Sequence, residues 1–472
     1  MKEQLTNDMS VGNPAKKLFF FAVPIVLGNL FQQLYNIIDS MVVGRFVGAQ
    51  ALAAVGASTA IVFLFVAVAT GSSIGYSVVI SQLFGAKDQD RMMTAIYTAL
   101  ISTFVLGLIL MIISAAGTGG ILVLMRTPAD IYRDAADYLR IYMFGLVFLF
   151  MYNTLNAVYN ALGASKIPLY FLAGSSILNI VLDLYFVIRL QMGVTGVAWA
   201  TLIAQGLAAV ISFINLLFRL KKIETETKPV LFDRKLLFQM GRIAVPSMVQ
   251  QSIVSFGMVF VQSLVNSFGS VVLAGYTAAT KIDSIAIMPM VNVGNAVSTF
   301  TAQNIGAKKP ERIREGLRAG RHMAAGIAVV ITGILFFKGD VLVAQFVDEA
   351  VNAEVIAIGV DYLRVVSVFY ALMGLMNVVN AVLRGAGDVG VFMAGTLCNF
   401  GCRVVFAYIL AYFLGASGIW WSVPIGWAAA FTIGTLRYRS GKWKEKELWS
   451  GRRIVKRRGR VYNDDKDLSG KL

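Results

Sequence analysis

AVPIVLGNLFQQLYN at residues 22–36 returns as AVPSMVQQSIVSFGM at residues 244–258, and this echo decides the fold. SQLFGAKDQDR at residues 81–91 likewise returns as AQNIGAKKPER at residues 302–312, and the tetrapeptide DYLR occurs twice at nearly the same spacing. Several echoes in one order at one spacing indicate an internal duplication of about 220 residues. We therefore expect two structurally similar halves.

The composition indicates a membrane protein. Of the 472 residues, 57% are hydrophobic and 14% are charged, whereas a soluble domain carries roughly 25% charged residues. Apolar runs long enough to cross a bilayer as helices, about 20 residues each, recur along the whole chain. None shows the two-residue alternation of a membrane β-barrel. The chain is therefore expected to be an all-α integral membrane protein.

We predict twelve transmembrane helices, six in each half. They lie at about 17–46, 50–82, 91–124, 134–160, 168–189, 193–219, 236–267, 272–303, 316–338, 355–383, 390–413 and 416–437. Because six is even, both halves enter the membrane from the same side, so a pseudo-two-fold axis along the membrane normal should relate the two six-helix bundles. The expected organisation is a cytoplasmic N-terminus (1–16), an N-terminal lobe (17–220), a cytoplasmic linker (221–235), a C-terminal lobe (236–438) and a basic cytoplasmic tail (439–472).

The basic residues set the orientation. Most of the 42 Lys and Arg residues lie in the termini and in the loops on the same side as the termini, and such an excess marks the cytoplasmic side. We therefore expect a multi-pass protein of the cell (inner) membrane with both termini in the cytoplasm. The net charge of +16 is then topogenic, and no nucleic-acid partner is expected. The basic tail either lies on anionic membrane lipids or is solvated.

The sequence offers no site for enzyme chemistry. There is no Walker loop for a nucleotide, so no ATPase and no cofactor are expected. Cys398 and Cys402 lie one helical turn apart without further soft ligands, a pattern typical of core packing rather than of a metal site. The apolar run after Lys17 is the first repeat element and lacks a cleavage site, so we expect it to be retained as a span.

Ionisable residues inside the spans are the main functional candidates, because each is costly to bury in a bilayer. Asp39 in the first span and Asp183 in the fifth lie at the same depth. Asn179 is one turn from Asp183 on the same helix face, and Thr201 in the sixth span falls at a similar level. Two carboxylates, an amide and a hydroxyl are thus expected to converge in the outer half of the first bundle.

Two neighbouring carboxylates in a low-dielectric setting cannot both stay ionised without a counter-charge, so the pair would hold a proton or a small cation. Ligands that are all oxygen atoms suit H⁺ or Na⁺ rather than a transition metal. The alternative is that both acids only hydrogen-bond neighbouring helices. Pro24 in the same span removes a helix hydrogen bond and provides a hinge, although its copy Pro246 also fits a duplicated packing feature.

The acidic site is not duplicated. Aligning NIVLD with NFGCR places Arg403 opposite Asp183, and the position of Asp39 has no acid in the second half. Arg403 needs a partner inside the membrane, and Asp283 in the eighth span lies at a matching depth. We therefore predict a contact between Arg403 and Asp283.

Further polar residues crowd the spans and predict a substrate cleft. They are Gln33, Tyr35, Asn36, Asn153, Asn156, Gln251, Asp283 and Asn377. Hydrogen bonds between helices would explain many of these residues equally well.

These features together resemble the multidrug and toxic compound extrusion (MATE) family over about residues 10–440. The resemblance rests on the two AVP starts, the two GAK loops and the LRGAGD segment at residues 383–388. The set Asp39, Asn179, Asp183 and Thr201 is similar to the cation-coupling site of the DinF-like branch. Span 7 has two glutamines and no glutamate, so the second acidic site of the NorM-like branch has no match.

The resemblance implies a secondary active antiporter, not an enzyme. It would export organic, cationic and amphipathic compounds in exchange for H⁺ or Na⁺ by alternating access, as a monomer in contact with membrane lipids and small-molecule substrates. A flippase for a lipid-linked precursor is the alternative within the same superfamily, and an ion channel or structural membrane protein is a third class. Twelve spans and few buried cations favour export.

Overall fold

The computed structural model describes residues 7–125, 127–345 and 353–445, and within these ranges the chain forms helices joined by short turns, with no strand. The part of the predicted basic tail from residue 446 onward lies outside the described residues. The all-α fold class is confirmed.

The first half forms six membrane-length segments, which we call the N-lobe. They are α1 (Pro14–Val42) continued by the π-helical turn η1 (Val43–Val47), α2 (Ala49–Gly85), α3 (Gln89–Leu124), α4 (Ala129–Phe144) with α5 (Leu146–Ala161), α6 (Lys166–Leu184) continued by the π-helical turn η2 (Tyr185–Arg189), and α7 (Gly193–Leu220). The α4–α5 pair is bent by 48°, so the fourth predicted span is not one straight helix.

The second half repeats this plan as the C-lobe. Its elements are α8 (Arg234–Asn266), α9 (Ser270–Gly306), α10 (Pro310–Ala344), α11 (Ala353–Ser367) with α12 (Tyr370–Gly385), α13 (Val389–Leu414), α14 (Ser417–Arg439) and a short 3₁₀ helix η3 (Lys442–Glu445). The α11–α12 pair is bent by 50° at the place that corresponds to the α4–α5 bend. The duplication seen in the sequence is therefore also present in the shape of each half.

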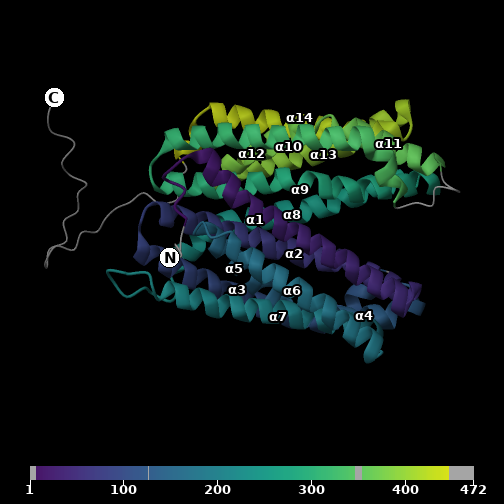
Figure 1. The fold of residues 1–472 in the computed structure, drawn as a ribbon, viewed down its shortest axis with the longest axis horizontal. Coiled ribbons are helices and arrows are strands. Elements are labelled where there is room, and N and C mark those ends of the chain that lie inside the picture. Colours follow the sequence, from purple (N-terminus) through teal and green to yellow (C-terminus); the bar gives the residue numbers. More distant parts are fainter. Residues whose placement is uncertain (1–6, 126, 346–352, 446–472) are drawn as a thin grey trace.

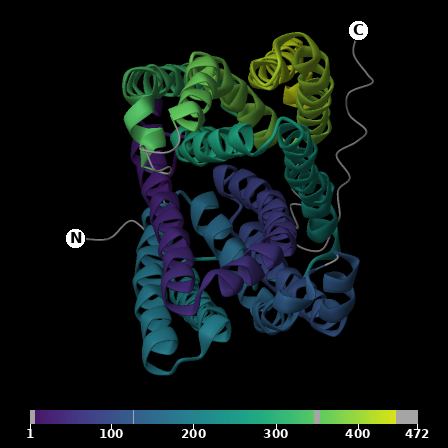
Figure 2. The ribbon, with the colours of Figure 1, turned by 90° about the vertical axis from the view of Figure 1, so that its right-hand side faces the viewer.

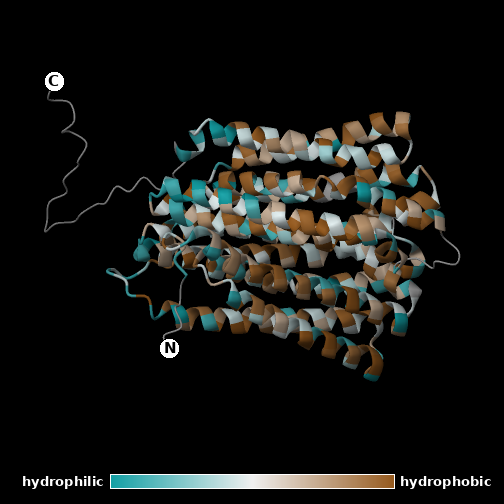
Figure 3. Ribbon diagram, turned by 45° about the horizontal axis from the view of Figure 1, so that its top comes forward, coloured by the Kyte–Doolittle hydropathy of each residue, from teal (hydrophilic) through white to brown (hydrophobic). Residues whose placement is uncertain are grey.

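The apolar character of the helices fits a membrane. Within the described residues, nine helices are long and apolar enough to cross a bilayer, and eleven spans result when each bent pair is taken as one. The seventh predicted span, at about 236–267, corresponds to α8, which at 33 residues is also long enough to cross. Figure 3 shows hydrophobic residues along the length of the helices and hydrophilic residues gathered at the left-hand end, where α1 begins and α14 ends. We call this the basic end and the opposite one the far end.

The two lobes lie side by side with their helices roughly parallel (Figure 1). Viewed along the helices, the C-lobe occupies one side and the N-lobe the other (Figure 2). Helix α1 packs against α6 of its own lobe and also against α9 and α10 of the C-lobe, while α8 packs against α2 and α3 of the N-lobe and against α13 of its own lobe. Helices α2 and α9 also contact each other. The lobes therefore contact each other through α1, α2, α8 and α9.

Reciprocal contacts join the lobes at the basic end. The side chain of Gln82 at the end of α2 donates to the carbonyl of Gly385 in the C-lobe at 3.1 Å. Its repeat counterpart, Gln303 at the end of α9, donates to the carbonyl of Ala161 in the N-lobe at 2.9 Å. The two hydrogen bonds are equivalent, since each lobe donates from the same repeat position to the same position of the other lobe. A two-fold axis between the lobes produces such a pair of contacts. Both helices end at the basic end, so the axis runs along the helices, as predicted.

Two glycines allow this crossing. A Cβ at Gly85 would lie 1.9 Å from the carbonyl oxygen of Gln303, and a Cβ at Gly306 would lie 1.8 Å from that of Gln82. Real Cβ atoms do not approach backbone oxygens so closely, so only glycine lets α2 and α9 meet backbone to backbone. The first residue of each GAK segment, Gly85 or Gly306, thus lies at the contact between α2 and α9 that closes the molecule at the basic end.

The N-terminal segment adds to the closure. The amide of Asn7 donates to the carbonyl of Leu162 in the N-lobe at 3.1 Å, whereas the amide of Met9 donates to Gln303 of the C-lobe at 2.9 Å. Arg312 of α10 donates to the carbonyl of Met9 at 3.1 Å, and the Met9 side chain is fully buried. Residues 7–9 therefore connect both lobes across the basic end.

An ion pair holds the end of α14 against the LRGAGD segment. Arg437 donates to the carboxylate of Asp388, whose side chain is 4% exposed, while the Arg437 side chain is 21% exposed. Leaving one member of a buried pair without the other costs several kcal/mol, and the partial exposure of Arg437 reduces that cost. Asp388→Asn should therefore lower the free energy of unfolding by about 2 kcal/mol.

Thermal unfolding of the detergent-solubilised protein measures this effect. Asp137→Asn is the matched control, because its pair with Arg140 spans 4.0 Å and is 42% and 58% exposed, and such pairs contribute about 0–1 kcal/mol. Equal melting temperatures for the two variants would show that the Asp388 pair adds no stability.

Candidate functional site

The four residues singled out in the sequence lie together in the N-lobe. Asp39 belongs to α1, Asn179 and Asp183 to α6, and Thr201 to α7. The Asn179 amide donates to the hydroxyl of Thr201 at 3.4 Å. The side chain of Asp183 is fully buried, that of Asn179 is 3% exposed, and the carboxyl groups of Asp39 and Asp183 are close enough to interact with each other. Three helices thus bring two acids, an amide and a hydroxyl to one point.

Close packing of α1 on α6 positions the acids. Gly28 of α1 lies against Leu169 and Leu172 of α6, whose side chains would make ordinary van der Waals contacts of 3.8 and 3.4 Å with a Cβ at this position. Asp39 and Asp183 each precede a π-helical turn, η1 and η2, and these two turns contact each other. Single π-helical turns widen a helix locally and are frequent at functional sites. They were not predicted, because the apolar sequences of both turns read as regular helix.

Several oxygens of this cluster have no hydrogen-bond donor. Within the described residues, Oδ1 of Asp39, Oδ1 of Asn179 and both carboxyl oxygens of Asp183 are buried without a partner. A buried acceptor without a donor is costly, and more so when it is charged. A proton shared between the two carboxyls would supply a donor, and a small cation such as Na⁺ would accept all four oxygens as ligands. The arrangement is therefore suited to holding H⁺ or Na⁺.

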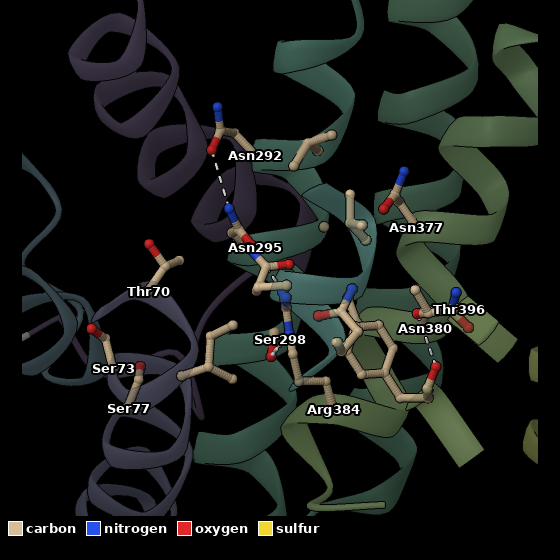
Figure 4. A pocket seen from close by; sticks show the side chains of 18 of the residues that line it. Thr70, Ser73, Ser77, Asn292, Asn295, Ser298, Asn377, Asn380, Arg384 and Thr396 are labelled. Carbon is tan, nitrogen blue, oxygen red and sulfur yellow. Dashed lines mark hydrogen bonds between the residues drawn. The ribbon is translucent and has the colours of Figure 1, made fainter. Parts of the chain in front are cut away.

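A second site lies between the lobes. It is a cavity of about 690 Å³ lined by α1, α2, α5, α8, α9, α12, α13 and α14. Its polar lining is mostly amides and hydroxyls, among them Ser73, Ser77, Asn292, Asn295, Asn377 and Asn380 (Figure 4). Ala302, next to the α2–α9 crossing, also lines it, so the cavity begins just above the closed basic end. A volume of this size matches a site for a drug-sized molecule.

The cavity takes in half of the predicted cleft residues. Asn153, Asn156, Gln251 and Asn377 line it, whereas Gln33, Tyr35, Asn36 and Asp283 are not among its lining residues. Tyr35 lies near Asp39 instead, and Asn36 donates to Gln33 along α1 at 3.5 Å. Polar residues on α1 and α5 look alike in a sequence, and only the tertiary packing separates those that face the other lobe from those that do not.

The predicted contact between Arg403 and Asp283 is wrong. Among the described residues no cation lies within 4.0 Å of Asp283, whose carboxylate accepts hydrogen bonds from Tyr362, at 3.3 Å, and from Tyr370. Two tyrosine hydroxyls from the bent α11–α12 pair thus satisfy the acid. Arg403 lines the cavity, and its buried Nε has no partner within the described part of the chain. The acid is therefore bonded to the tyrosines rather than to the arginine at the same depth.

Arg384 is the lining residue whose role was not recognised in the sequence. It lies in the last turn of α12 and donates through Nε to Ser298 at 3.2 Å and through Nη2 to Asn295 at 2.8 Å. Its guanidinium also lies 5.8 Å from the centre of the Phe392 ring. The signal was present, because LRGAGD has an arginine where its first-half copy NALGASK has Asn160.

The two sites are separate. None of the four residues of the acidic cluster, which includes Asp183, lines the cavity between the lobes. The first site lies inside the N-lobe, on the face of α1 that packs against α6, while the cavity lies at the interface of the lobes. The helix α1 takes part in both, since Ile25 and Asn29 line the cavity and Asp39 belongs to the acidic cluster. A change at one site can therefore reach the other through α1.

The amino-acid sequence matches one family model and proteins that are named as multidrug resistance proteins. The family model described as MatE matches residues 24–185 and 246–409, once in each half. The chain is 30% identical over 450 residues to the probable multidrug resistance protein YpnP of Bacillus subtilis (strain 168), covering 94% of this chain and 99% of that protein. It is 29% identical to the probable multidrug resistance protein YoeA of the same strain, covering 92% of this chain and 95% of that protein.

The structure is similar to a solved structure as well. A multidrug resistance MATE family transporter of the MOP superfamily, solved in an outward-facing conformation, superposes with a TM-score of 0.86 at 25% sequence identity. The superposition covers 94% of this chain and 100% of that chain.

Proposed function

Since this chain belongs to the MATE family of multidrug efflux transporters, we propose that it exports organic compounds in exchange for a cation, H⁺ or Na⁺, that binds at Asp39 and Asp183. The protein is a transporter and not an enzyme. The proposal assigns the cation to the N-lobe, with Asn179 and Thr201 as further ligands or hydrogen-bond partners, and the exported compound to the cavity between the lobes.

One observation carries the proposal. Four buried oxygens from Asp39, Asn179 and Asp183 lack donors within the described residues, at a point where no described basic side chain pairs with either acid. A merely structural pair of acids would be hydrogen-bonded, as Asp283 is by two tyrosines. The unmet need for a cation is what a coupling site requires, because acids already paired with a fixed basic side chain would not need a mobile cation.

The closed basic end supports an outward-facing state. If the basic end lies in the cytoplasm, the crossing of α2 and α9 separates the cavity from the cytoplasm, and a cation can enter the N-lobe only from outside. Binding there would pull α1 onto α6, and Pro24 is the proposed hinge at which α1 bends. Because α1 also contacts α9 and α10, a bend would change the packing between the lobes and release the basic end.

The proposal includes location and assembly. The protein would lie in the cell membrane with both termini in the cytoplasm and with lobes at 17–220 and 236–438 joined by the 221–235 linker. Asp90 of α3 accepts hydrogen bonds from the linker amides of Glu226, at 2.9 Å, and Thr227, at 3.1 Å, which holds the linker against the N-lobe. Both sites are built from one chain, so a monomer suffices. The lipid-linked precursor flippase is not favoured, because the relatives are named multidrug resistance proteins.

Transport by the purified protein in proteoliposomes tests this function. Vesicles loaded with high H⁺ or high Na⁺, at zero membrane potential, should take up amphipathic fluorescent compounds faster than vesicles without a gradient. Uptake that responds to one of the two cations identifies the coupling ion. Uptake that is equal with and without either gradient would contradict antiport.

A further inference from the structure

The cavity between the lobes has an unbalanced charge. Among the described residues that line it there is no aspartate and no glutamate, whereas Arg384 and Arg403 both line it. An organic cation is recognised by carboxylates or by open aromatic faces. The described lining of this cavity therefore offers no carboxylate to a cationic substrate, and of its two aromatic side chains, Phe392 already faces Arg384.

Arg384 lacks a counter-ion within reach. No described acidic oxygen lies within 4.0 Å of its guanidinium, and the nearest acid in the sequence, Asp388, pairs with Arg437 instead. Ser298 and Asn295 hold Nε and Nη2, which fixes the direction of the guanidinium. Nη1 makes no hydrogen bond to the described residues. An oriented and uncompensated guanidinium at the closed floor of a cavity is a ready-made partner for an anionic group.

Arg403 places a second positive charge on the same wall. It follows Val389, the first residue of α13, by 14 positions, which at 1.5 Å per residue is roughly 20 Å from the basic end. Its buried Nε has no partner among the described residues, while the Tyr276 hydroxyl and the carboxylate of Asp283, which is bonded to two tyrosines, act on its guanidinium. The two arginines thus lie at different depths, one at the floor and one toward the far end.

The rest of the lining fits an amphipathic anion. The amide of Asn380 can donate hydrogen bonds to acidic oxygens beside Arg384, whereas Thr396 and Asn377 already donate to the carbonyls of Phe392 and Met373 (Figure 4). Apolar side chains such as Ile74, Ile287 and Met376 line other parts of the cavity and would contact an uncharged portion of the ligand. The N-lobe counterpart of Arg384 is Asn160, so the positive charge lies on the C-lobe side alone.

We propose that the compound carried in this cavity is an amphipathic organic anion. Arg384 holds its carboxylate, sulfonate or phosphate group, and the compound passes Arg403 on its way to the far end. This inference rests on the proposed function and names the substrate class of the same cavity. It assigns cation and substrate to opposite lobes, with the cation at the acids of the N-lobe and the anion at the arginines of the C-lobe.

The proposal changes how transport responds to voltage. Exchange of one monovalent cation for one organic cation moves no net charge, whereas inward movement of a cation and outward movement of an anion both carry positive charge inward. Two charges moved across 100 mV correspond to roughly a 10³-fold gradient of the exported compound. Voltage dependence therefore reports the sign of the substrate.

Uptake of two fluorescent probes with the same fluorophore into proteoliposomes tests the proposal. Dansylglycine carries a carboxylate and dansylcadaverine an ammonium group. In vesicles loaded with the coupling cation, the full chain should transport dansylglycine, faster when a potassium diffusion potential makes the lumen positive, and dansylcadaverine little above protein-free liposomes. Transport of dansylcadaverine but not of dansylglycine would overturn the anion proposal and leave the exporter intact. Transport of neither would overturn the proposed function together with it.

Variants connect the result to the cavity. Arg384→Gln should reduce dansylglycine uptake by about 10-fold or more, as expected for the loss of a charge-assisted hydrogen bond, and Arg384→Lys should retain part of it. Arg403→Gln keeps the proposal testable if Arg384 variants do not fold. Arg364→Gln is the control, because that arginine belongs to the same lobe, is exposed and does not line the cavity. Dansylglycine uptake that is unchanged in both Arg384→Gln and Arg403→Gln would contradict the assignment.

A third probe distinguishes a soluble anion from a membrane lipid as the transported compound. A short-chain fluorescent phosphatidylglycerol carries its phosphate on a membrane lipid, whereas dansylglycine is a free compound. Gradient-driven uptake of dansylglycine without movement of the lipid supports a soluble anion as the cargo. Movement of the lipid alone would overturn that assignment.

Discussion

Asp183→Asn should reduce gradient-driven export by about 100-fold, which is the upper range of coupling free energies between two sites. The substitution keeps the size of the side chain but removes the charge that holds a proton or a cation. Because Asp183 is fully buried and neither of its oxygens has a donor within the described residues, the neutral amide should be tolerated by the fold. The measurement is the initial rate of uptake into proteoliposomes with an imposed cation gradient.

Asp137→Asn is the control for this prediction. It removes an aspartate from the same lobe, at an exposed position that makes only a long pair with Arg140. Its transport rate should stay within about 2-fold of the parent, because exposed pairs contribute little. Equal losses in the two variants would mean that any acid removed from the N-lobe impairs the protein, and the assignment of Asp183 would fail.

Gly306→Ala should shift the molecule away from the closed basic end. The added Cβ would lie 1.8 Å from the carbonyl oxygen of Gln82 and 2.9 Å from the amide nitrogen of Ala86, and both are backbone atoms that cannot rotate away. Overpacking of this kind costs about 1–3 kcal/mol even where side chains can move. A shift of about 3 kcal/mol turns a balanced equilibrium between two conformations into a ratio above about 100 to 1. We therefore expect transport to fall by a similar factor.

Labelling of a cysteine in the cavity measures the shift. In a background without Cys398 and Cys402, Ser77→Cys places a thiol in the lining of the cavity. An impermeant maleimide should reach this thiol from the basic side in the Gly306→Ala protein and not in the parent. Gly326→Ala is the control, because nothing lies within 4 Å of a Cβ at that position. Labelling that is unchanged by Gly306→Ala would show that the α2–α9 crossing does not close the cavity.

The duplication and the depth of residues in the membrane could both be predicted from the sequence, because they depend only on positions along the chain. The duplication predicted two bundles on one axis, and the structure confirms it in the reciprocal contacts of Gln82 and Gln303. The depth of Asp39 and Asp183 follows from counting residues along two spans, and the structure places both acids together. These inferences held because a helix has a fixed rise, so distance along the membrane normal can be read from residue number.

Contacts between side chains on different helices could not be predicted in the same way. Arg403 and Asp283 share a depth but form no ion pair, because the bent α11–α12 pair brings two tyrosines to the acid. Arg384 was part of a recognised motif, yet its place in the cavity depends on contacts with α9, which is 80 residues away or more. The bend between α4 and α5, and its copy in the C-lobe, also have no proline to announce them.

The central claim is that the acids of the N-lobe couple the cation and that the cavity between the lobes carries the compound. Exchange of labelled for unlabelled substrate across vesicles without any cation gradient separates the two. The account predicts that Asp183→Asn loses gradient-driven uptake but keeps exchange, because the cavity that binds the compound is intact. Loss of both in a protein that remains folded would contradict it, since the acids would then belong to the transport path of the compound itself.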